Sequence, residues 1–207
     1  MTIVDSSYAL MAGFNYVAEH EGLPKVSHES VMEYIATPIV AYCEGVLGEY
    51  RPEYLKLFRE GSKKFERELI KPFEDTIPTL TELKSMGIKL SVVSNREKPS
   101  IVLEREGLDK YFDVIVGAEE PYGKLHYKPN PEMILELLKH LNVDSDEAVY
   151  VGDADVDIVT ALAAKVRGIG ITKGTFNREE FNLLGAWKVI DSLSELIQIV
   201  KDDAYLK

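Results

Sequence analysis

Apolar positions follow two different patterns in two parts of the chain. From about residue 5 to residue 72 they recur every three or four positions, which is typical of amphipathic helices. From about residue 76 to residue 201, short apolar runs alternate with helical patterns. We therefore expect an all-helical domain over residues 5–72, next to an α/β core built from residues 1–4 and 73–207.

Capping residues and prolines divide the first part into helices. Asp5 or Ser6 can cap a first helix, and Ser27 can cap a second one. Pro38 is expected to kink or break the second helix, and Pro52 suits the first turn of a third. The expected helices cover residues 5–20, 27–47 and 52–70.

The second part reads as alternating strands and helices. The expected strands cover residues 88–93, 114–116, 148–151, 169–171 and 188–190. The expected helices cover residues 77–86, 99–106, 131–141, 156–165 and 193–200. This alternation favours a mostly parallel, Rossmann-like sheet with helices on both faces. Ligands bind at the carboxyl ends of the strands in such sheets, so polar residues at those ends are the candidates for function.

Two of these candidates suit phosphate. Ser94 and Asn95 directly follow an expected strand, where a hydroxyl and nearby backbone N–H groups can hold a phosphate oxygen. An ordinary strand-to-helix turn would also explain both residues. Lys128 lies between Tyr127 and a Pro-Asn-Pro segment that stiffens its loop. A lysine there can supply positive charge to a phosphate, although an isolated loop lysine is more often only solvated.

The third candidate is acidic. Asp153 ends an expected strand, and Asp157 follows four residues later in the first turn of a helix, so the two carboxylates lie near one another. Oxygen ligands of this kind suit Mg²⁺. Asp155 is expected to be the helix N-cap, and Asp157 could serve only to stabilise the helix dipole. Asp153 has no evident structural duty.

Charge and cysteine content limit the classes of function. The net charge is −11, which argues against nucleic acids and anionic membranes as partners and means that a phosphate site needs local positive charge or a metal. Cys43 is the one cysteine, so neither an intrachain disulfide nor a cysteine-based metal site can form. No apolar stretch is long enough to span a membrane, and no signal peptide is recognisable. We expect a cytoplasmic protein, monomeric or homodimeric.

Taken in chain order, Ser94-Asn95, the Lys128-Pro-Asn-Pro segment and Gly152-Asp-Ala-Asp-Val-Asp resemble the second, third and fourth motifs of the haloacid dehalogenase superfamily. The helical part is placed like the cap domain of its phosphoglycolate-phosphatase-like branch. The resemblance implies a Mg²⁺-dependent phosphatase of a small phosphorylated metabolite, acting through an aspartyl-phosphate intermediate. It implies that Asp153 and Asp157 bind the metal and that Ser94, Asn95 and Lys128 bind phosphate. Lys128 and Asp157 would also take part in catalysis.

The chain departs from the family pattern at its first motif, Asp-x-Asp-x-Thr, which carries the nucleophile and the general acid/base. Thr2 matches the threonine of that motif, so both aspartates would lie upstream of Met1. Asp5 is better explained as a helix cap than as the nucleophile. A central strand of five or six apolar residues contributes about 10 kcal/mol of hydrophobic burial, similar to the whole net stability of a domain. We therefore expect the reading frame to continue upstream, with an internal methionine read as the initiator.

Two other interpretations stay open at this point. The first is a catalytically inactive protein that keeps the fold and binds a phosphorylated ligand or another protein. The second is a receiver-type signalling domain, but there the acidic pair comes early in the chain and the lysine late, which is the reverse of the order found here. The identity of the substrate does not follow from the sequence.

Overall fold

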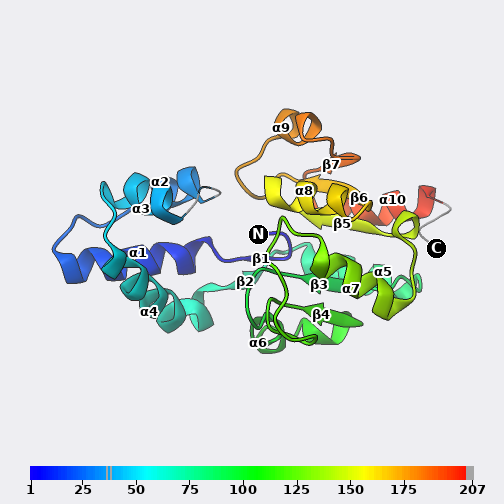
Figure 1. The fold of residues 1–207 in the computed structure, drawn as a ribbon, viewed down its shortest axis with the longest axis horizontal. Coiled ribbons are helices and arrows are strands. Elements are labelled where there is room, and N and C mark those ends of the chain that lie inside the picture. The colour runs from blue at the N-terminus through cyan, green and yellow to red at the C-terminus, as the bar shows by residue number, and fades with distance from the viewer. Residues whose placement is uncertain (36, 38, 204–207) are drawn as a thin grey trace. The chain divides into compact units, whose positions relative to one another are not determined.

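A computed structural model describes residues 1–35, 37 and 39–203. The chain forms two compact units, one containing Met1 and Ile3–Lys71 and the other containing Thr2 and the residues from Pro72 onward. Figure 1 gives the order of the elements along the chain. Among the described residues, no helix is both long and apolar enough to cross a membrane.

The first unit is helical. Its helices are α1 (Ser7–Glu21), α2 (His28–Tyr34), α3 (Ile39–Leu47) and α4 (Pro52–Leu69). Two short strands, β1 (Val4–Asp5) and β2 (Lys71–Pro72), pair at the two ends of this segment. The predicted second helix is divided into α2 and α3, and Pro38, the predicted site of the break, lies outside the described residues.

The caps of the helical unit use the expected residues. The Asp5 carboxylate accepts hydrogen bonds from the Ser7 backbone N–H at 2.8 Å and from the Ser7 hydroxyl at 2.6 Å. The Ser27 hydroxyl accepts from the Ser30 backbone N–H at 3.1 Å. Gly22 ends α1 in the left-handed conformation, with φ = +68°. The N-cap position of α1 is Ser6, whose side chain makes no cap bond, and the Asp5 carboxylate one residue earlier binds the first N–H of the helix instead.

Two glycines allow α1 and α4 to approach closely. A Cβ atom on Gly61 of α4 would overlap the Tyr16 side chain and would lie 3.1 Å from the Gly13 Cα atom in α1. A Cβ atom on Gly13 would in turn overlap the Ser62 side chain. Close backbone approach of this kind leaves no room for even one added methyl group. Beside this crossing, a buried cluster fills the unit, consisting of Phe14, Val31, Tyr42 and Cys43.

We expect Gly61→Ala to lower the free energy of unfolding by about 1–2 kcal/mol, although alanine is the better helix former by about 1 kcal/mol, because overpacking outweighs propensity. Urea denaturation monitored by circular dichroism measures the change. Glu60→Ala, at the exposed neighbouring position, is the control and should have little effect. Equal or higher stability of the Gly61 variant would contradict the close crossing.

The second unit is the α/β unit. Its strands are β3 (Ser91–Val93), β4 (Val114–Val116), β5 (Val149–Gly152), β6 (Arg167–Ile171) and β7 (Lys188–Ile190). Its helices are α5 (Thr76–Ser85), α6 (Ser100–Arg105), α7 (Glu132–Leu141), α8 (Asp155–Ala163), α9 (Arg178–Leu183) and α10 (Glu195–Asp202). The predicted strand at 88–93 forms only over its last three residues. Helix α9 was not predicted.

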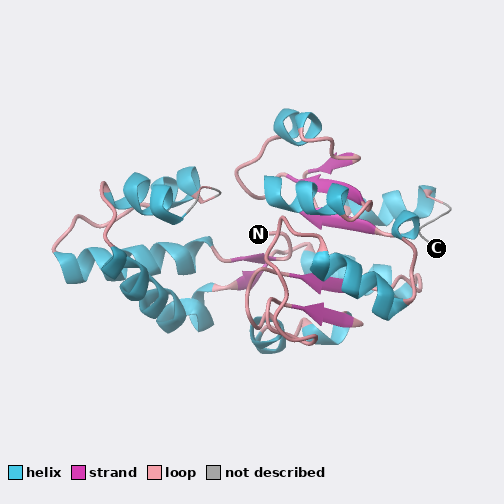
Figure 2. Cartoon of the chain, viewed as in Figure 1, coloured by secondary structure: helices cyan, strands magenta, loops and turns pink. Residues whose placement is uncertain are grey.

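All strand pairs of this unit with assigned registers are parallel, as the alternating pattern predicts. β3 pairs with β4, and β5, β6 and β7 pair in that order. The strands thus form two groups, visible as separate sets of arrows in Figure 2. Within the described residues, β3 and β5 each have a partner strand on one edge only. The contrast in burial is clear, because the last four residues of the doubly paired β6 are buried whereas all of β3 is half-buried.

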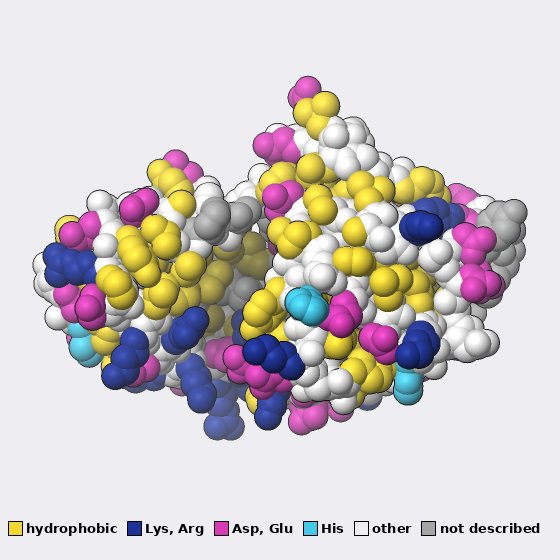
Figure 3. Space-filling view, viewed as in Figure 1, with side chains coloured by type: hydrophobic (Ala, Val, Ile, Leu, Met, Phe, Trp, Pro, Cys, Tyr) yellow, Lys and Arg dark blue, Asp and Glu magenta, His cyan; other side chains and the backbone are white. Residues whose placement is uncertain are grey.

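Helices cover these strands. α8 packs on β5 and β6, α7 packs on β4, and α9 packs on β7. One buried cluster joins the two groups of strands, with Ile134, Ala164 and Val166 packed against Val93 at the end of β3 and Tyr150 of β5. Charged side chains of both signs are interspersed over the visible surface of each unit (Figure 3), so the net charge of −11 does not form a single acidic face there.

Asp113 ties the amino ends of β3 and β4 together. Its carboxylate accepts from the Leu90 backbone N–H at 2.8 Å and from the Lys84 ammonium at 2.9 Å. Partial burial alone would raise the pKa of Asp113, but the hydrogen bonds from Lys84 and Leu90 outweigh it and hold the pKa below its ordinary value.

A lowered folded-state pKa stabilises the protein above the ordinary value of about 3.9, and this contribution is lost as the pH falls through the folded-state value. We therefore expect Asp113→Asn to lower stability at pH 7 and to flatten the loss of stability below about pH 5. Thermal unfolding measured from pH 3 to pH 7 tests this. Parallel stability curves for the variant and the parent chain would show that Asp113 contributes no pH dependence.

Candidate functional site

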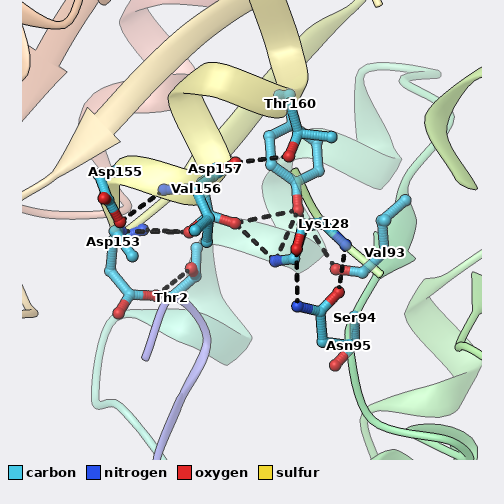
Figure 4. Close-up of polar contacts among 12 residues, drawn as sticks. Thr2, Val93, Ser94, Asn95, Lys128, Asp153, Asp155, Val156, Asp157 and Thr160 are labelled. Carbon is cyan, nitrogen blue, oxygen red and sulfur yellow. Dashed lines mark hydrogen bonds and ion pairs between the residues drawn. The ribbon is translucent and has the colours of Figure 1, made fainter. Parts of the chain in front are cut away.

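Polar side chains gather at the carboxyl ends of β3 and β5, as the fold class predicts. Figure 4 shows Ser94 and Asn95 after β3, Asp153 and Asp157 around the β5–α8 turn, and Lys128 from the loop before α7. The structure therefore brings all five predicted site residues into one region of the α/β unit.

A buried ion pair lies at the centre of this region. The Lys128 ammonium is 2.6 Å from Asp157 Oδ1, and the side chains are only 13% and 7% exposed. Burial alone would lower the pKa of Lys128. The negative charge of Asp157 and the hydrogen bonds to Asp157 and Tyr150 outweigh this effect and raise the pKa above its ordinary value. Lys128 is therefore a fixed cation at neutral pH.

Tyr150 joins the ion pair to the end of β3. Its hydroxyl lies 3.2 Å from the Lys128 ammonium, 3.3 Å from Asp157 Oδ1 and 3.3 Å from the Val93 carbonyl oxygen. Burial raises the pKa of Tyr150, so the hydroxyl keeps its proton and can donate to Val93 or Asp157 while it accepts from Lys128. The hydroxyl thus spans the two groups of strands.

The other oxygen of Asp157 is bound by the turn that precedes α8. Asp157 Oδ2 accepts from the backbone N–H groups of Asp153 and Ala154, each at 3.1 Å. Gly152 leaves room for this arrangement, because a Cβ atom there would overlap the Asp157 side chain. Both oxygens of Asp157 therefore have protein partners. Its predicted role as a metal ligand stays a prediction.

Asp153 lies against the start of the chain and against a second loop. Its Oδ1 accepts from the Thr2 hydroxyl at 2.8 Å. A Cβ atom on Gly174, after β6, would lie 2.5 Å from the Asp153 carbonyl oxygen and 3.0 Å from its Oδ2. Asp155 is not the N-cap that we predicted, because Ala154 takes that position and the Asp155 carboxylate accepts from the Val156 N–H instead. The error is one residue, and the strand continues to Gly152 before the turn begins.

Ser94 and Asn95 differ in what they contact. The Ser94 hydroxyl accepts from the Arg96 backbone N–H at 3.2 Å, as in an ordinary turn. Asn95 Oδ1 accepts from the Lys128 N–H at 2.7 Å, and its amide donates to the Lys128 carbonyl oxygen at 3.4 Å. Asn95 therefore holds the backbone of the Lys128 loop in place. The predicted contacts of both residues with phosphate stay predictions.

The matching family model is that of haloacid dehalogenase-like hydrolases, and it covers residues 1–171, which include this site. The chain belongs to that family. Among the residues that the structure describes, no group of three or more His, Cys, Asp or Glu side chains could hold a metal ion. Asp153 and Asp157 remain the predicted metal-binding residues of this hydrolase.

Relatives of known name agree with the family assignment. The chain is 31% identical over 205 residues to a Caldanaerobacter subterraneus protein given the provisional name pyrophosphatase PpaX, covering 97% of this chain and 90% of that one. It is 34% identical over 160 residues to phosphoglycolate phosphatase of Aquifex aeolicus, covering 76% and 74%. These relatives confirm the resemblance to the phosphoglycolate-phosphatase-like branch.

Solved structures support the fold. A hydrolase of this family from Streptococcus pneumoniae superposes with a TM-score of 0.80 at 18% identity, covering 96% of this chain and 93% of that one. A Bacteroides fragilis protein, provisionally named as a haloacid dehalogenase-like hydrolase, has a TM-score of 0.77 at 29% identity and covers 94% of both chains. The predicted Rossmann-like α/β class is confirmed.

Two members of the site were missed from the sequence of this hydrolase. Tyr150 reads as an apolar strand residue, and the one available signal was that a buried tyrosine hydroxyl requires a partner. Gly174 follows an expected strand and carries no sequence signal of a role in the site. Its place beside Asp153 depends on the path of the loop after β6, which no local pattern specifies.

We expect Asp157→Asn to lower the free energy of unfolding by about 3 kcal/mol, because the variant leaves the buried Lys128 ammonium without its counter-charge. Urea unfolding at pH 7 measures the loss. Asp155→Asn, two residues away, is the matched control and should cost much less, because the Asp155 carboxylate accepts from the Val156 N–H of its own turn. Equal effects of the two substitutions would contradict a central role of the ion pair.

Proposed function

We propose that this hydrolase cleaves a phosphoryl group from a small phosphorylated metabolite and uses Mg²⁺ as its cofactor. The observation that carries the proposal is the fixed Lys128 cation between Asp157 and Tyr150, at the strand ends that also bear Ser94 and Asp153. Relatives named pyrophosphatase, phosphoglycolate phosphatase and glyceraldehyde 3-phosphate phosphatase support this substrate class.

Each site residue has a role in this proposal. The Lys128 ammonium has three donor hydrogens, so it can bind a phosphoryl oxygen while it keeps Asp157 and Tyr150 as partners. The Ser94 hydroxyl can turn its hydrogen toward a second phosphoryl oxygen while it accepts from the Arg96 backbone N–H. Asn95 would assist by holding the lysine loop, in addition to any contact with phosphate.

The carboxylates fit Mg²⁺ unequally. Asp153 presents hard oxygen ligands at the end of β5, and it is the residue that would bind the ion directly. Asp157 would act through a water molecule or through Lys128, because its oxygens already accept from backbone N–H groups and from the lysine. When bound, the ion would neutralise charge that develops on the phosphoryl oxygens.

The reaction also needs a nucleophile, and we propose that residues upstream of Met1 supply it on a further strand between β3 and β5. Three observations support this placement. β3 and β5 each have one unpaired edge among the described residues, and β3 is half-buried throughout. Thr2, which matches the last residue of the family's first motif, donates to Asp153. An aspartate just before Thr2 would therefore lie beside the acidic corner.

The proposed chemistry has two steps. A carboxylate oxygen of the upstream aspartate forms a bond to phosphorus while the bond from phosphorus to the leaving-group oxygen breaks. A second aspartate would protonate that leaving group. Water then hydrolyses the acyl phosphate, which releases inorganic phosphate and restores the carboxylate. Lys128 would offset the charge on the nucleophile and on the phosphoryl oxygens throughout.

The helical unit is proposed to be the cap that selects the substrate and excludes water from the reaction. A cytoplasmic location and a monomeric or homodimeric state also remain predictions. The alternative is an inactive protein that binds a phosphorylated ligand. It is supported by the protein partners of Asp157, whose two oxygens already accept from Lys128 and from backbone N–H groups.

A chain extended upstream by about twenty codons should hydrolyse small phosphoesters in the presence of Mg²⁺, whereas residues 1–207 alone should show little or no turnover. A phosphate-release screen over pyrophosphate, phosphoglycolate and glyceraldehyde 3-phosphate measures both proteins side by side. Lys128→Met in the extended chain is the control, and we expect it to lower kcat/KM at least about a hundredfold, similar to the loss of one charge-stabilising donor elsewhere.

Each part of the proposal can fail separately. Clear Mg²⁺-dependent turnover by residues 1–207 would rule out the need for an upstream nucleophile. An in-frame stop codon directly before Met1 would rule out the proposed upstream strand. An extended chain that binds phosphate in a Lys128-dependent manner but releases none from any substrate would support the inactive binding protein instead.

A further inference from the structure

A second ion pair, between Asp75 and Lys173, connects the start of α5 to the loop that follows β6. Asp75 precedes α5 at the N-cap position, where an aspartate normally caps its own helix, yet its side chain makes no such bond. Instead it pairs with the Lys173 ammonium and accepts from the Ser192 hydroxyl at 2.9 Å and the Leu193 N–H at 2.8 Å. The Asp75 side chain therefore binds the loops after β6 and β7 and does not cap its own helix.

The lysine is held as firmly as the aspartate. The Lys173 side chain is 13% exposed, and its ammonium lies 4.3 Å from the centre of the Phe73 ring. Partial burial would raise the pKa of Asp75, but the bonds from Lys173, Ser192 and Leu193 outweigh it and lower the pKa. Asp75 therefore remains charged at neutral pH and keeps its ion pair with Lys173.

The loop itself contacts the acidic corner. Its first residue, Thr172, donates its backbone N–H to the Ile190 carbonyl oxygen at 3.0 Å and its hydroxyl to Asp191 at 2.7 Å. Lys173 comes next, and Gly174 then packs on the carbonyl oxygen and the carboxylate of Asp153 so closely that a Cβ atom would not fit. Thr172 and Lys173 are both anchored by these bonds. Gly174, the next residue, therefore has little freedom to move away from Asp153.

We propose that Asp75 and Lys173 are positioning residues, which hold the Thr172–Gly174 loop against Asp153 and thereby orient its carboxylate. The inference rests on the proposed function, in which Asp153 binds Mg²⁺. Ligands of a metal depend on the groups that orient them, and loss of such a group typically costs about ten- to a hundredfold in metal affinity. Neither residue contacts the phosphoryl group or the ion in this proposal.

The chain contains a matched control for this pair. Asp113 also binds a lysine ammonium and a backbone N–H, and its pKa is lowered in the same way, but it lies at the amino ends of β3 and β4. Asp75→Asn and Asp113→Asn therefore remove the same chemistry from opposite ends of the strands. Lys173→Met removes the other charge of the pair and keeps the apolar contact with Phe73.

The experiment measures three quantities on the full chain, namely Mg²⁺ affinity by titration calorimetry, amide hydrogen exchange of residues 172–176, and thermal stability. We expect Asp75→Asn and Lys173→Met each to weaken Mg²⁺ binding by about tenfold and to speed exchange in that segment. The double variant should lose no more than either single variant, because the two residues act as one unit. Asp113→Asn should lower thermal stability without changing Mg²⁺ affinity or that exchange.

Two results would overturn the inference. One is an Asp75→Asn variant that loses stability as Asp113→Asn does but keeps parental Mg²⁺ affinity and parental exchange in residues 172–176. The other is unchanged amide exchange in both the Asp75 and the Lys173 variants. If the parent chain binds no Mg²⁺, that result contradicts the proposed metal site, and amide exchange of residues 172–176 is then the measurement that tests the positioning role.

Discussion

A lysine ammonium that is removed from water needs a counter-charge, and Asp157 supplies it for Lys128. Much of the site depends on this requirement. Asp157 can reach the lysine only because Gly152 leaves space beside it and because two backbone N–H groups bind its other oxygen. The same turn places Asp153 at the end of β5. The acidic sequence of this turn is thus explained first by the burial of one cation, and a metal is an additional role for it.

The ion pair also bears on how the two groups of strands are held together. Tyr150 belongs to β5, and its hydroxyl reaches the Val93 carbonyl oxygen at the end of β3 while it contacts both charges. The buried cluster around Ile134, Ala164 and Val166 also joins the two groups, because Val93 of β3 and Tyr150 of β5 both pack against it. A backbone carbonyl at the end of a strand normally pairs with a neighbouring strand. A side-chain hydroxyl as its partner is consistent with an edge that another strand can occupy.

The sequence predicted what depends on local pattern. Capping and first-turn residues such as Ser27 and Pro52 predicted helices, and the alternation of apolar runs with helical patterns predicted the parallel strands. The polar residues at the expected strand ends were the five site residues. Prediction from the sequence failed where contacts between residues far apart in the chain determine the structure. The strand at 88–93 is shortened because Leu90 donates to Asp113 rather than to a neighbouring strand. The partners of Asn95 and Asp75 lie 33 and 98 residues away, and no local pattern reports such pairs.

The charges of the site explain why a lysine alone would not suffice for phosphate. The Lys128 charge is balanced by Asp157, so the ion pair brings no net positive charge to an anion. At about 4 Å and an effective dielectric constant of 20, the attraction of the ammonium for an anion, about 4 kcal/mol, is offset by a repulsion of similar size from the carboxylate. The overall charge of −11 adds to the repulsion. The proposed Mg²⁺ would supply the positive charge that the ion pair does not. This need for added positive charge supports the proposed cofactor on electrostatic grounds, beside the family to which the chain belongs.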